Sequence, residues 1–508
     1  MDNTNGLIAF LSQGELVPHH KPFPRYYLSV AEWQQMIQEA ARAKWALLGI
    51  WGEPDEVHAA FYEGNTQEIA VASIVCAQGS FPSLSSVYPG AIRLERTIQD
   101  FTGLTAEGLA DNRLWLDHGQ FPMQYPLRGD DLPATPRPAT EYTYLPVHGE
   151  GLHEIPVGPV HAGIIEPAHF RFTCNGETVV RLEQRLGYVH KGIERLMQGK
   201  TVEEAAKIAG RISGDSTVAH SLAFARAVEA ALDVPVPSHA HWLRAIMAEM
   251  ERIANHFGDI GAICNDAAFA FMFAQCGILR ERVLAVAQEL FGHRLMMDCI
   301  IPGGVKRDLR EKDIGTLRDL VVGLRRDFAP LIDIYENTLT LQDRTMTTGV
   351  VSAALVHRFA AGGFVGRASA RGFDARRTPS YPPYDNIDFD VPVFSEGDVN
   401  ARIWVRIREI EASLGIIEHL IHKNYHPGNI LAKIPQRGGE GMALVEGFRG
   451  DILIWVRLDD EGHVARCFPR DPSWFQWPLL EAAIDQNIVA DFPLCNKSFN
   501  CSYSGQDL

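Results

Sequence analysis

The sequence PVGPVHAGIIEPAHFRF occupies residues 156–172, RLGYVHKGIE occupies residues 185–194, and RISGDSTVAH occupies residues 211–220. These three pieces are dense in polar side chains that could face a reacting centre. Apolar residues at three- and four-residue spacing dominate the chain that follows, which is typical of helices with one core face. We therefore expect a polar site that a helical block encloses.

Composition sets limits on the partners. At 508 residues the chain is long enough for two or more domains. The net charge of −16, with acidic residues spread along the chain, disfavours nucleic acid and anionic lipid as direct partners. The sequence has neither a long apolar run nor a basic and then apolar N-terminus, so we expect a cytoplasmic chain without a membrane span or signal peptide. The eight cysteines are scattered with no C-x-x-C spacing, so we expect no metal or iron-sulfur cluster bound by this chain.

Hydrophobic periodicity and turn residues predict the elements. Residues 1–125 form a small α+β domain, 126–158 a proline-rich linker, and 159–508 a mainly α-helical domain with small antiparallel sheets, so the fold class is α+β. In the first domain we expect a helix over 31–43 capped by Ser29 and strands over 46–51, 56–63 and 68–76. In the last domain we expect a hairpin turning at Asn175-Gly176, helices over 201–231, 238–263, 267–291, 313–341, 400–424 and near 477–486, and a hairpin from 451–457 and 463–467.

The three pieces at 156–220 resemble the N-terminal signature of two related families. Gly-Pro-x-His, Glu-Pro-x-His-Phe, Arg-Leu-Gly-Tyr-x-His-x-Gly-x-Glu and Arg-x-x-Gly ending in Ala-His occur here in the order of that signature. The families are the large subunits of group 4 [NiFe]-hydrogenases and the D subunits of NADH-quinone oxidoreductase, respiratory complex I. The resemblance implies a large-subunit domain over 159–508.

A second resemblance covers the N-terminal domain. Pro-Ser-x-Ser at 82–85, Pro-Gly-Ala at 89–91 and Glu-Arg-x-x-x-Asp-x-x-Gly at 95–103 are similar to the signature of the C subunits of complex I. A C-like piece joined to a D-like piece resembles the large subunits of formate hydrogenlyase and hydrogenase-4 complexes. The C-like domain would dock neighbouring subunits. The alternative interpretation of this segment is a generic loop followed by an amphipathic helix.

The sequence departs from the resemblance at the metal ligands. In a [NiFe]-hydrogenase two C-x-x-C pairs hold the metals, the first in a segment such as Arg-Ile-Cys-Gly-Ile-Cys and the second in Asp-Pro-Cys-x-x-Cys near the C-terminus. Residues 211–216 read Arg-Ile-Ser-Gly-Asp-Ser, and residues 498–504 read Ser-Phe-Asn-Cys-Ser-Tyr-Ser. Serine hydroxyls are poor ligands for this centre because they are hard and rarely ionise. We therefore expect the nickel-iron centre to be absent.

The complex I resemblance also meets a departure. That branch places a quinone-headgroup histidine shortly after Gly-Pro-x-His, where Ile164 and Ile165 stand here, and a tyrosine at the position of Gly214. The usual quinone pair is therefore missing. Whether the complex uses NAD(H) or quinone stays open.

The remaining polar side chains are candidate site residues. The resemblance implies catalytic roles for Glu166, His169, Asp215, His220 and Arg367, substrate-binding roles for His161, Ser213 and Ser216, and a cavity lining that also includes Arg185, His190, Arg211 and Asp374. A buried carboxylate or imidazole can relay protons because its pKa is tunable. The alternative is that these groups form a structural hydrogen-bond and ion-pair network.

The resemblance implies the large subunit of an oxidoreductase complex that is active only when assembled. Its partners would be a small [4Fe-4S] subunit similar to the B subunits of complex I, a ferredoxin-like subunit and antiporter-like subunits of a membrane arm. Electron transfer would be coupled to proton or ion translocation, and the chain would lie on the inner face of the cell membrane through these partners. Two alternatives stay open: a non-catalytic scaffold or conformational-coupling subunit, and a true [NiFe]-hydrogenase, against which the serines argue.

Overall fold

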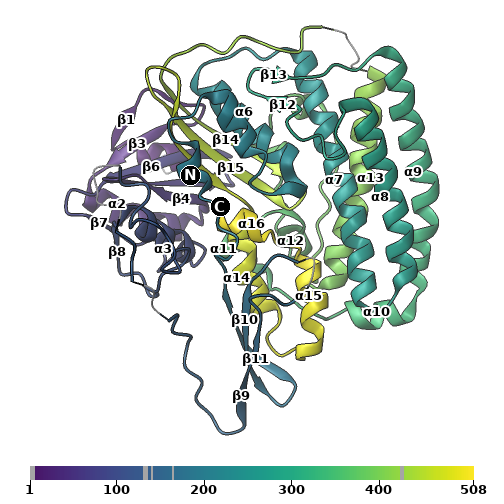
Figure 1. Cartoon of the computed structure of the whole chain (residues 1–508), viewed down its shortest axis with the longest axis horizontal. Helices are drawn as coiled ribbons and strands as arrows, with labels where there is room; N and C mark the ends of the chain where they lie inside the picture. The colour runs from purple at the N-terminus through teal and green to yellow at the C-terminus, as the bar shows by residue number, and fades with distance from the viewer. Residues whose placement is uncertain (1–5, 130–134, 139–140, 163–164, 424–427) are drawn as a thin grey trace.

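The computed structural model describes residues 6–129, 135–138, 141–162, 165–423 and 428–508. Ile164, which the sequence analysis placed at a former quinone position, lies outside the described residues. The described chain combines sheets with long helices (Figure 1), which confirms the predicted α+β class. Among the described residues, no helix is both long and apolar enough to span a bilayer.

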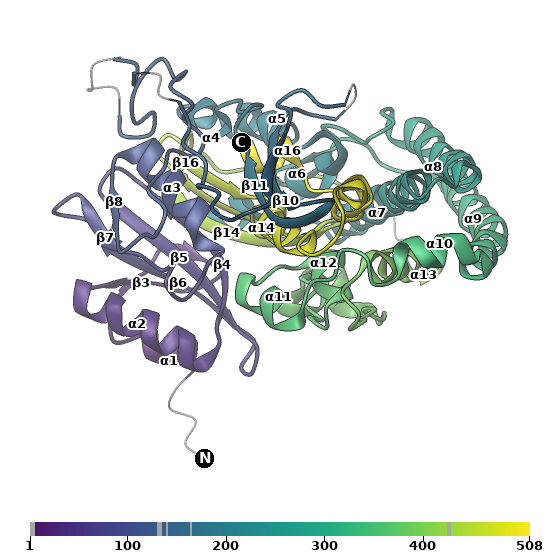
Figure 2. The same ribbon diagram turned by 90° about the horizontal axis from the view of Figure 1, so that it is seen from below.

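The N-terminal part is built on a five-stranded sheet of order β1-β3-β6-β5-β4. Its strands are β1 (Glu15–Val17), β3 (Arg25–Leu28), β4 (Ala46–Gly52), β5 (Glu56–Glu63) and β6 (Glu68–Val75). Helices α1 (Leu7–Leu11) and α2 (Val30–Ala43) cover one face, and α3 (Ala91–Thr102) lies on the other (Figure 2). The predicted cap is confirmed, since Ser29 and Glu32 form a reciprocal capping box. A short parallel pair, β7 (Ser80–Pro82) and β8 (Thr105–Glu107), lies beside α3.

A second sheet joins the two halves of the chain. Its order is β16-β15-β14-β2, formed by β2 (His20–Lys21), β14 (Gly439–Gly447), β15 (Gly450–Leu458) and β16 (Val464–Arg470). The predicted hairpin of β15 and β16 is confirmed. Helix α6 (Thr217–Ala231) packs closely on this sheet, because a Cβ on Gly441 would lie only 2.2 Å from the Ala227 carbonyl oxygen.

A three-stranded sheet projects from the body of the molecule (Figure 1). It contains β9 (Leu152–Val157), β10 (His169–Asn175) and β11 (Thr178–Arg185), in the order β11-β10-β9. The predicted hairpin turn is confirmed, with Gly176 at φ +58°. Strand β9 lies within the segment predicted as a linker, and its extended residues pair with β10 of the following part of the chain.

Long helices form the other side of the molecule (Figure 1), namely α7 (Ser238–Asp266), α8 (Ala270–Phe291), α9 (Glu311–Asn337) and α13 (Val399–Lys423). The remaining helices are α4 (Ile193–Met197), α5 (Val202–Ala209), α10 (Leu339–Thr345), α11 (Ala353–Phe359), α12 (Gly363–Ala368), α14 (Ser473–Ala483), α15 (Phe492–Phe499) and α16 (Tyr503–Asp507). A small hairpin, β12 (Ile300–Ile301) and β13 (Gly304–Val305), and four short helical turns, η1 (Gly214–Ser216), η2 (Arg376–Ser380), η3 (Tyr384–Asn386) and η4 (Val489–Asp491), complete the described elements.

Three predicted helices have different bounds. The predicted helix over 201–231 is interrupted between α5 and η1, since Lys191 Nζ donates to the carbonyl oxygens of Arg211 and Ile212 at 2.7 and 2.8 Å. The carbonyl oxygens of Arg211 and Ile212 thus accept from the Lys191 side chain. Residues 213–215, which follow them before α6, line a cavity that is described below. The predicted helix over 313–341 ends at Asn337 before α10 begins, and the one near 477–486 is α14. The domain boundaries at 125 and 158 stay predictions.

Candidate functional site

A polar cavity of about 360 Å³ lies where the 211–216 loop meets the C-terminal residues. It is lined by Ile165, Glu166, Ser213, Gly214, Asp215, Arg449, Asn496, Lys497, Asn500, Cys501, Ser502, Tyr503 and Ser504. Three predicted site residues, Glu166, Ser213 and Asp215, are therefore brought together. We call this space the hydroxyl cavity because Ser213, Ser502 and Ser504 line it.

The serines form a directed chain of hydrogen bonds. Ser213 Oγ donates to Asp215 Oδ1 at 2.8 Å, so its lone pairs can accept from Ser502 Oγ, also 2.8 Å away. Ser502 Oγ in turn accepts from Gly505 N at 2.9 Å and lies 3.5 Å from Ser504 Oγ. Each hydroxyl can thus donate toward the carboxylate of Asp215. Ser216 is buried beside this chain, with its Oγ 3.5 Å from Asp215 Oδ1.

A buried arginine holds Asp215 in its ionised form. Arg449 lies in the β14–β15 turn, immediately before β15, and its guanidinium spans both carboxylate oxygens, with Nη1 at 2.7 Å from Oδ1. Burial opposes ionisation, but the charge and hydrogen bonds of Arg449 outweigh it and hold the pKa of Asp215 below its usual range. Arg449 Nε also binds the carbonyl oxygen of Asn500. Asp215 is therefore a fixed negative charge at one end of the serine chain.

A second carboxylate stands at the other end. Glu166 Oε2 accepts from the backbone N–H of Ser504 at 3.1 Å, at the start of α16. Glu166 lies in the segment between β9 and β10, so the projecting sheet delivers this carboxylate to the cavity. The cavity therefore places a carboxylate on each side of a row of hydroxyl groups.

The residues present do not fit a nickel-iron centre. In the first of the two facing segments Ser213 and Ser216 stand at C-x-x-C spacing, and in the second the same spacing joins Cys501 and Ser504, so at most one of the four positions offers a thiol. Hydroxyl groups are poor ligands for nickel because they are hard and rarely ionise. Cys501 lines the cavity, but burial raises the pKa of its thiol and so disfavours the thiolate that binds metal.

Two predicted site histidines lie behind the cavity wall. His220 is fully buried on α6, with Nδ1 3.0 Å from the Ser216 carbonyl oxygen and Nε2 3.3 Å from Asp471 Oδ2. Burial raises the pKa of Asp471, but the hydrogen bond and charge of His220 overcome this and lower it to about 2. The ring of His161 lies 6.4 Å from that of Tyr503, whose residue lines the cavity. The described lining of the hydroxyl cavity includes neither histidine; His220 contacts Ser216 and Asp471 beside it, and His161 lies near Tyr503.

Other predicted residues lie elsewhere. Arg367 is wholly buried and donates to Glu409 at 2.7 Å, Glu446 at 2.9 Å and the Phe373 carbonyl oxygen. The described lining of the hydroxyl cavity includes neither Arg367 nor His169, whose ring lies 5.1 Å from that of Tyr144. The other expected lining residues have partners outside the hydroxyl cavity. Arg185 donates to the Leu114 carbonyl oxygen, Arg211 pairs with Asp298, and Asp374 pairs with Arg376. His190 lines a separate pocket. The assigned roles of all these residues stay predictions.

Sequence reasoning missed several cavity residues. Arg449 follows strand β14, which was not predicted, and no spacing links it to Asp215, which lies 234 residues away. Ser502 lies in the quoted segment 498–504, but no spacing in the sequence singles it out as the partner of Ser213.

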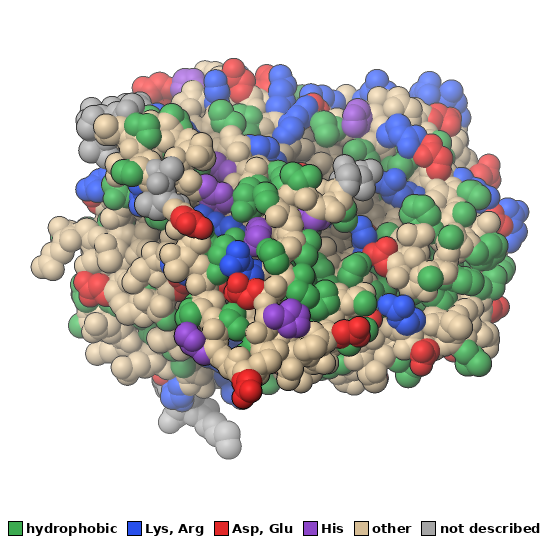
Figure 3. Space-filling model, turned by 60° about the horizontal axis from the view of Figure 1, so that its bottom comes forward, with side chains coloured by type: hydrophobic (Ala, Val, Ile, Leu, Met, Phe, Trp, Pro, Cys, Tyr) green, Lys and Arg blue, Asp and Glu red, His purple; other side chains and the backbone are tan. Residues whose placement is uncertain are grey.

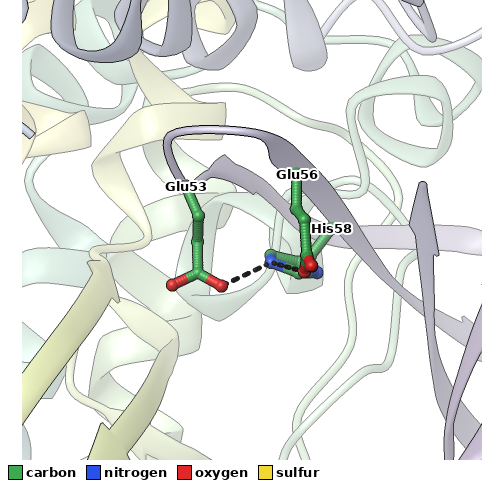
Figure 4. A group of neighbouring side chains, drawn as sticks. All are labelled: Glu53, Glu56 and His58. Carbon is green, nitrogen blue, oxygen red and sulfur yellow. Dashed lines mark hydrogen bonds and ion pairs between the residues drawn. The ribbon is translucent and has the colours of Figure 1, made fainter. Parts of the chain in front are cut away.

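A second group of possible metal ligands lies in the N-terminal sheet (Figure 4). Atoms of Glu53, Glu56 and His58 lie within 4.8 Å of one another. Both carboxylates already have partners, because Arg457 binds Glu53, with Nη1 2.7 Å from Oε2, and Tyr27 donates to Glu56 Oε2 at 2.8 Å. The Arg457 pair connects the end of β4 to β15. We therefore interpret this group as a contact that holds the N-terminal sheet against the second sheet.

Comparisons with known proteins place three segments in families. Residues 43–137 match the family described as respiratory-chain NADH dehydrogenase, 30 Kd subunit, and residues 259–437 match the family of the 49 Kd subunit of the same enzyme. Residues 191–258 match the family described as nickel-dependent hydrogenase. The order of the matches agrees with the predicted joining of a C-like piece to a large-subunit piece.

Individual proteins with similar sequences or folds agree with these family matches. Formate hydrogenlyase subunit 5 of Escherichia coli (strain K12) is 31% identical over 439 residues, which cover 84% of this chain and 77% of that protein. Hydrogenase-4 component G of the same strain is 33% identical over 450 residues, covering 86% and 78%. A chain of the membrane-bound sulfane sulfur reductase, an archaeal respiratory membrane complex, superposes with a TM-score of 0.67 at 26% identity, covering 71% of this chain and 99% of that one.

Proposed function

Because the chain belongs to the family that unites the large subunits of hydrogenase-4, formate hydrogenlyase and other nickel-dependent hydrogenases with the 30 and 49 Kd subunits of respiratory NADH dehydrogenase, we propose that it is the large subunit of a membrane-associated oxidoreductase complex. In that complex it takes part in electron transfer from an iron-sulfur partner, coupled to proton or ion translocation. It does so without nickel.

We propose the partners that the resemblance in the sequence implies. They are a small [4Fe-4S] subunit similar to the B subunits of complex I, a ferredoxin-like subunit and antiporter-like subunits of a membrane arm. The chain would reach the inner face of the membrane through them. Acidic and basic side chains are interspersed on the face in Figure 3, and histidine and apolar side chains gather nearer its middle. That pattern suits protein partners better than nucleic acid.

One observation carries the nickel-free proposal. The two segments that the resemblance assigns to metal thiolates meet through the hydroxyl groups of Ser213 and Ser502, 2.8 Å apart. At that distance the two hydroxyl groups hydrogen-bond to each other, and neither is a suitable ligand for a nickel-iron centre, which thiolates hold.

The cavity has the groups that a proton path needs. Because Asp215 is held ionised, Ser213 donates to it, and Ser502 can donate to Ser213. The hydroxyl groups are therefore held in one orientation, and Asp215, paired with Arg449, takes up no proton itself. Glu166, on the far side, is the other carboxylate of the cavity, and its Oε2 accepts from the backbone N–H of Ser504. We assign to Glu166 the role of proton donor and acceptor for the coupled step.

A non-catalytic role is the second candidate. The ion pair of Asp215 with Arg449 connects η1 to the β14–β15 turn, and such contacts would also suit a subunit that transmits conformational change. In that case the hydroxyl cavity would be structural. A true [NiFe]-hydrogenase has no support from the cavity residues.

Purification from native membranes tests the proposed function. The tagged full chain should copurify with integral membrane subunits and with a small subunit whose reduced [4Fe-4S] cluster gives an electron paramagnetic resonance signal. An untagged strain is the control. Recovery of the chain alone from the soluble fraction, without a cluster-containing partner, would contradict the proposal.

A further inference from the structure

A separate cavity of about 610 Å³ lies between α3, the segment that follows β8, and the residues before α4. Its volume is within the range of small-molecule sites in proteins. Its walls are mainly apolar and aromatic, and they include Phe101, Phe121, Met123, Tyr188, His190 and Leu196. We call it the aromatic pocket.

His190 is one of the polar side chains that line the pocket. Its Nδ1 lies 2.6 Å from the carbonyl oxygen of Asp507, and a carbonyl can only accept, so Nδ1 carries the proton of this bond. Burial lowers the pKa of His190, which favours the neutral ring. In a neutral ring with Nδ1 protonated, Nε2 is a hydrogen-bond acceptor.

The charged side chains of the pocket are bound to protein groups; one of them, Arg195, donates from Nη1 to Gln198 Oε1 at 2.8 Å. Burial, together with nearby Arg185, lowers the pKa of His118 to about 4, and its Nε2 lies 2.8 Å from the Leu186 carbonyl oxygen. Lys191 Nζ is bound to the carbonyl oxygens of the cavity loop, and Glu194 pairs with Arg466. The pocket is therefore suited to an uncharged occupant.

The rings of the pocket favour a flat occupant. Phe121 and His190 are stacked, with ring centroids 4.9 Å apart and planes at 29°, and Phe101 lies 6.2 Å from Phe121. On another side, His118 and Tyr188 meet edge to face at 4.8 Å. Aromatic walls at these angles give a planar ring both stacking and edge contacts.

We propose that the aromatic pocket binds an uncharged, planar aromatic molecule that donates a hydrogen bond from a hydroxyl or N–H group to Nε2 of His190. The site is distinct from the hydroxyl cavity. The two share no lining residue, and α16 contributes Tyr503 and Ser504 to the cavity while its last residue, Asp507, binds His190 on the pocket side. The inference does not depend on the proposed function.

Binding of three matched probes to the full-length chain tests this site. 1-Naphthol has the donor, 1-methoxynaphthalene has a similar shape without it, and naphthalene has neither oxygen nor donor. We expect 1-naphthol to bind about ten-fold more tightly than 1-methoxynaphthalene by calorimetry, which corresponds to one buried hydrogen bond. Equal affinities for 1-naphthol and 1-methoxynaphthalene would overturn the proposal.

Two variants locate the binding. His190→Phe keeps an aromatic ring beside Phe121 but lacks the acceptor, so it should lower the affinity for 1-naphthol to that of 1-methoxynaphthalene and leave the latter unchanged. Leu196→Trp, at a half-exposed wall position, should fill the pocket and weaken all three probes, and it still decides the question if His190→Phe does not fold. Phe271→Ala, at an exposed apolar position outside the pocket lining, is the control and should change nothing.

The last measurement is the binding of 1-naphthol to the assembled complex. If 1-naphthol binds the isolated chain but not the purified complex, a side chain of a partner protein fills the pocket, and the small-molecule proposal is overturned. Binding that neither His190→Phe nor Leu196→Trp weakens would overturn it as well. Equal affinities in the chain and in the complex, lost in Leu196→Trp, would support it.

Discussion

The hydroxyl oxygens of Ser213 and Ser502 lie 2.8 Å apart although 289 residues separate them in the chain. Ser213 precedes η1 and Ser502 caps α16, so this contact fixes the C-terminal helix against the cavity loop. The Ser502 backbone N–H adds a bond to Ser473 Oγ at 2.8 Å. The cavity is therefore held together by hydrogen bonds between segments that come from distant parts of the chain.

A double-mutant cycle tests that contact. Ser213→Ala and Ser502→Ala should each lower the free energy of unfolding, and the double variant should lose less than the sum, because either change alone already breaks the bond. We expect a coupling energy of about 1 kcal/mol, the usual net value for one hydrogen bond. Chemical denaturation of the four proteins measures it. Strict additivity would show that the two hydroxyl groups do not interact.

Glu166→Gln tests whether the cavity handles protons. The substitution keeps the shape and the hydrogen bond to Ser504 N but removes the ability to ionise. We expect reoxidation of the reduced partner cluster in the complex to slow by about ten-fold or more, as for a lost acid-base group. Complex assembly should not change.

A matched control makes this result specific. Glu177→Gln changes an exposed carboxylate at the hairpin turn of the same sheet and should affect neither rate nor assembly. If turnover is unchanged in a fully assembled Glu166→Gln complex, the cavity is structural and the scaffold alternative is favoured.

Glu251 gives a pH-dependent prediction. Burial raises the pKa of this carboxyl to about 8, although it accepts from the backbone N–H groups of Val218 and Ala219 at 2.7 and 3.0 Å. A raised pKa means that the folded state favours the neutral acid, so this contribution to stability is complete below pH ~4.5 and is lost as pH rises toward 8. Each pKa unit corresponds to about 1.4 kcal/mol.

Replacement by glutamine should remove this dependence. Glu251→Gln is neutral at every pH and can still accept at Oε1. The variant should therefore lose less stability than the parent chain between about pH 5 and pH 8, as measured by the free energy of unfolding at both values. An identical pH dependence in the two proteins would show that Glu251 ionises in the folded chain as readily as in water.

Arg367→Lys tests whether a predicted catalytic residue is structural. The arginine contacts Glu409, Glu446 and a backbone carbonyl at once, and a lysine cannot reproduce this geometry. Loss of a partner in a buried ion-pair network costs about 3–5 kcal/mol, so the variant should melt at a markedly lower temperature. A variant with normal melting but slowed cluster reoxidation in the complex would instead support a catalytic role.

Local signals predicted much of the fold. The Asn175-Gly176 turn, the Ser29 cap and the long helices α7, α8 and α13 could be predicted because each depends on residues close in sequence. Strand β14 was not predicted, although it forms a hairpin with its neighbour β15; its other edge pairs with β2 from the far end of the chain. The break in the predicted 201–231 helix also arises from a distant group, Lys191.

Residues of the hydroxyl cavity could be predicted from the sequence where they lie in a recognised motif. Glu166, Ser213 and Asp215 lie in the quoted motifs, and the structure brings them to one cavity. The contacts of Arg449 with Asp215 and of Ser502 with Ser213 depend on tertiary packing, so no spacing in the sequence indicates them. Arg367 shows the opposite case, because its motif resembles a site segment while its side chain is enclosed by acidic partners.

Nickel analysis of the purified complex tests the central claim most directly. Plasma mass spectrometry should find iron in amounts that match the partner's [4Fe-4S] clusters and nickel well below one atom per chain. A nickel-containing hydrogenase purified from the same host, with nickel in the medium, is the positive control. One nickel atom per chain in the complex, with hydrogen uptake on viologen dyes, would contradict the account.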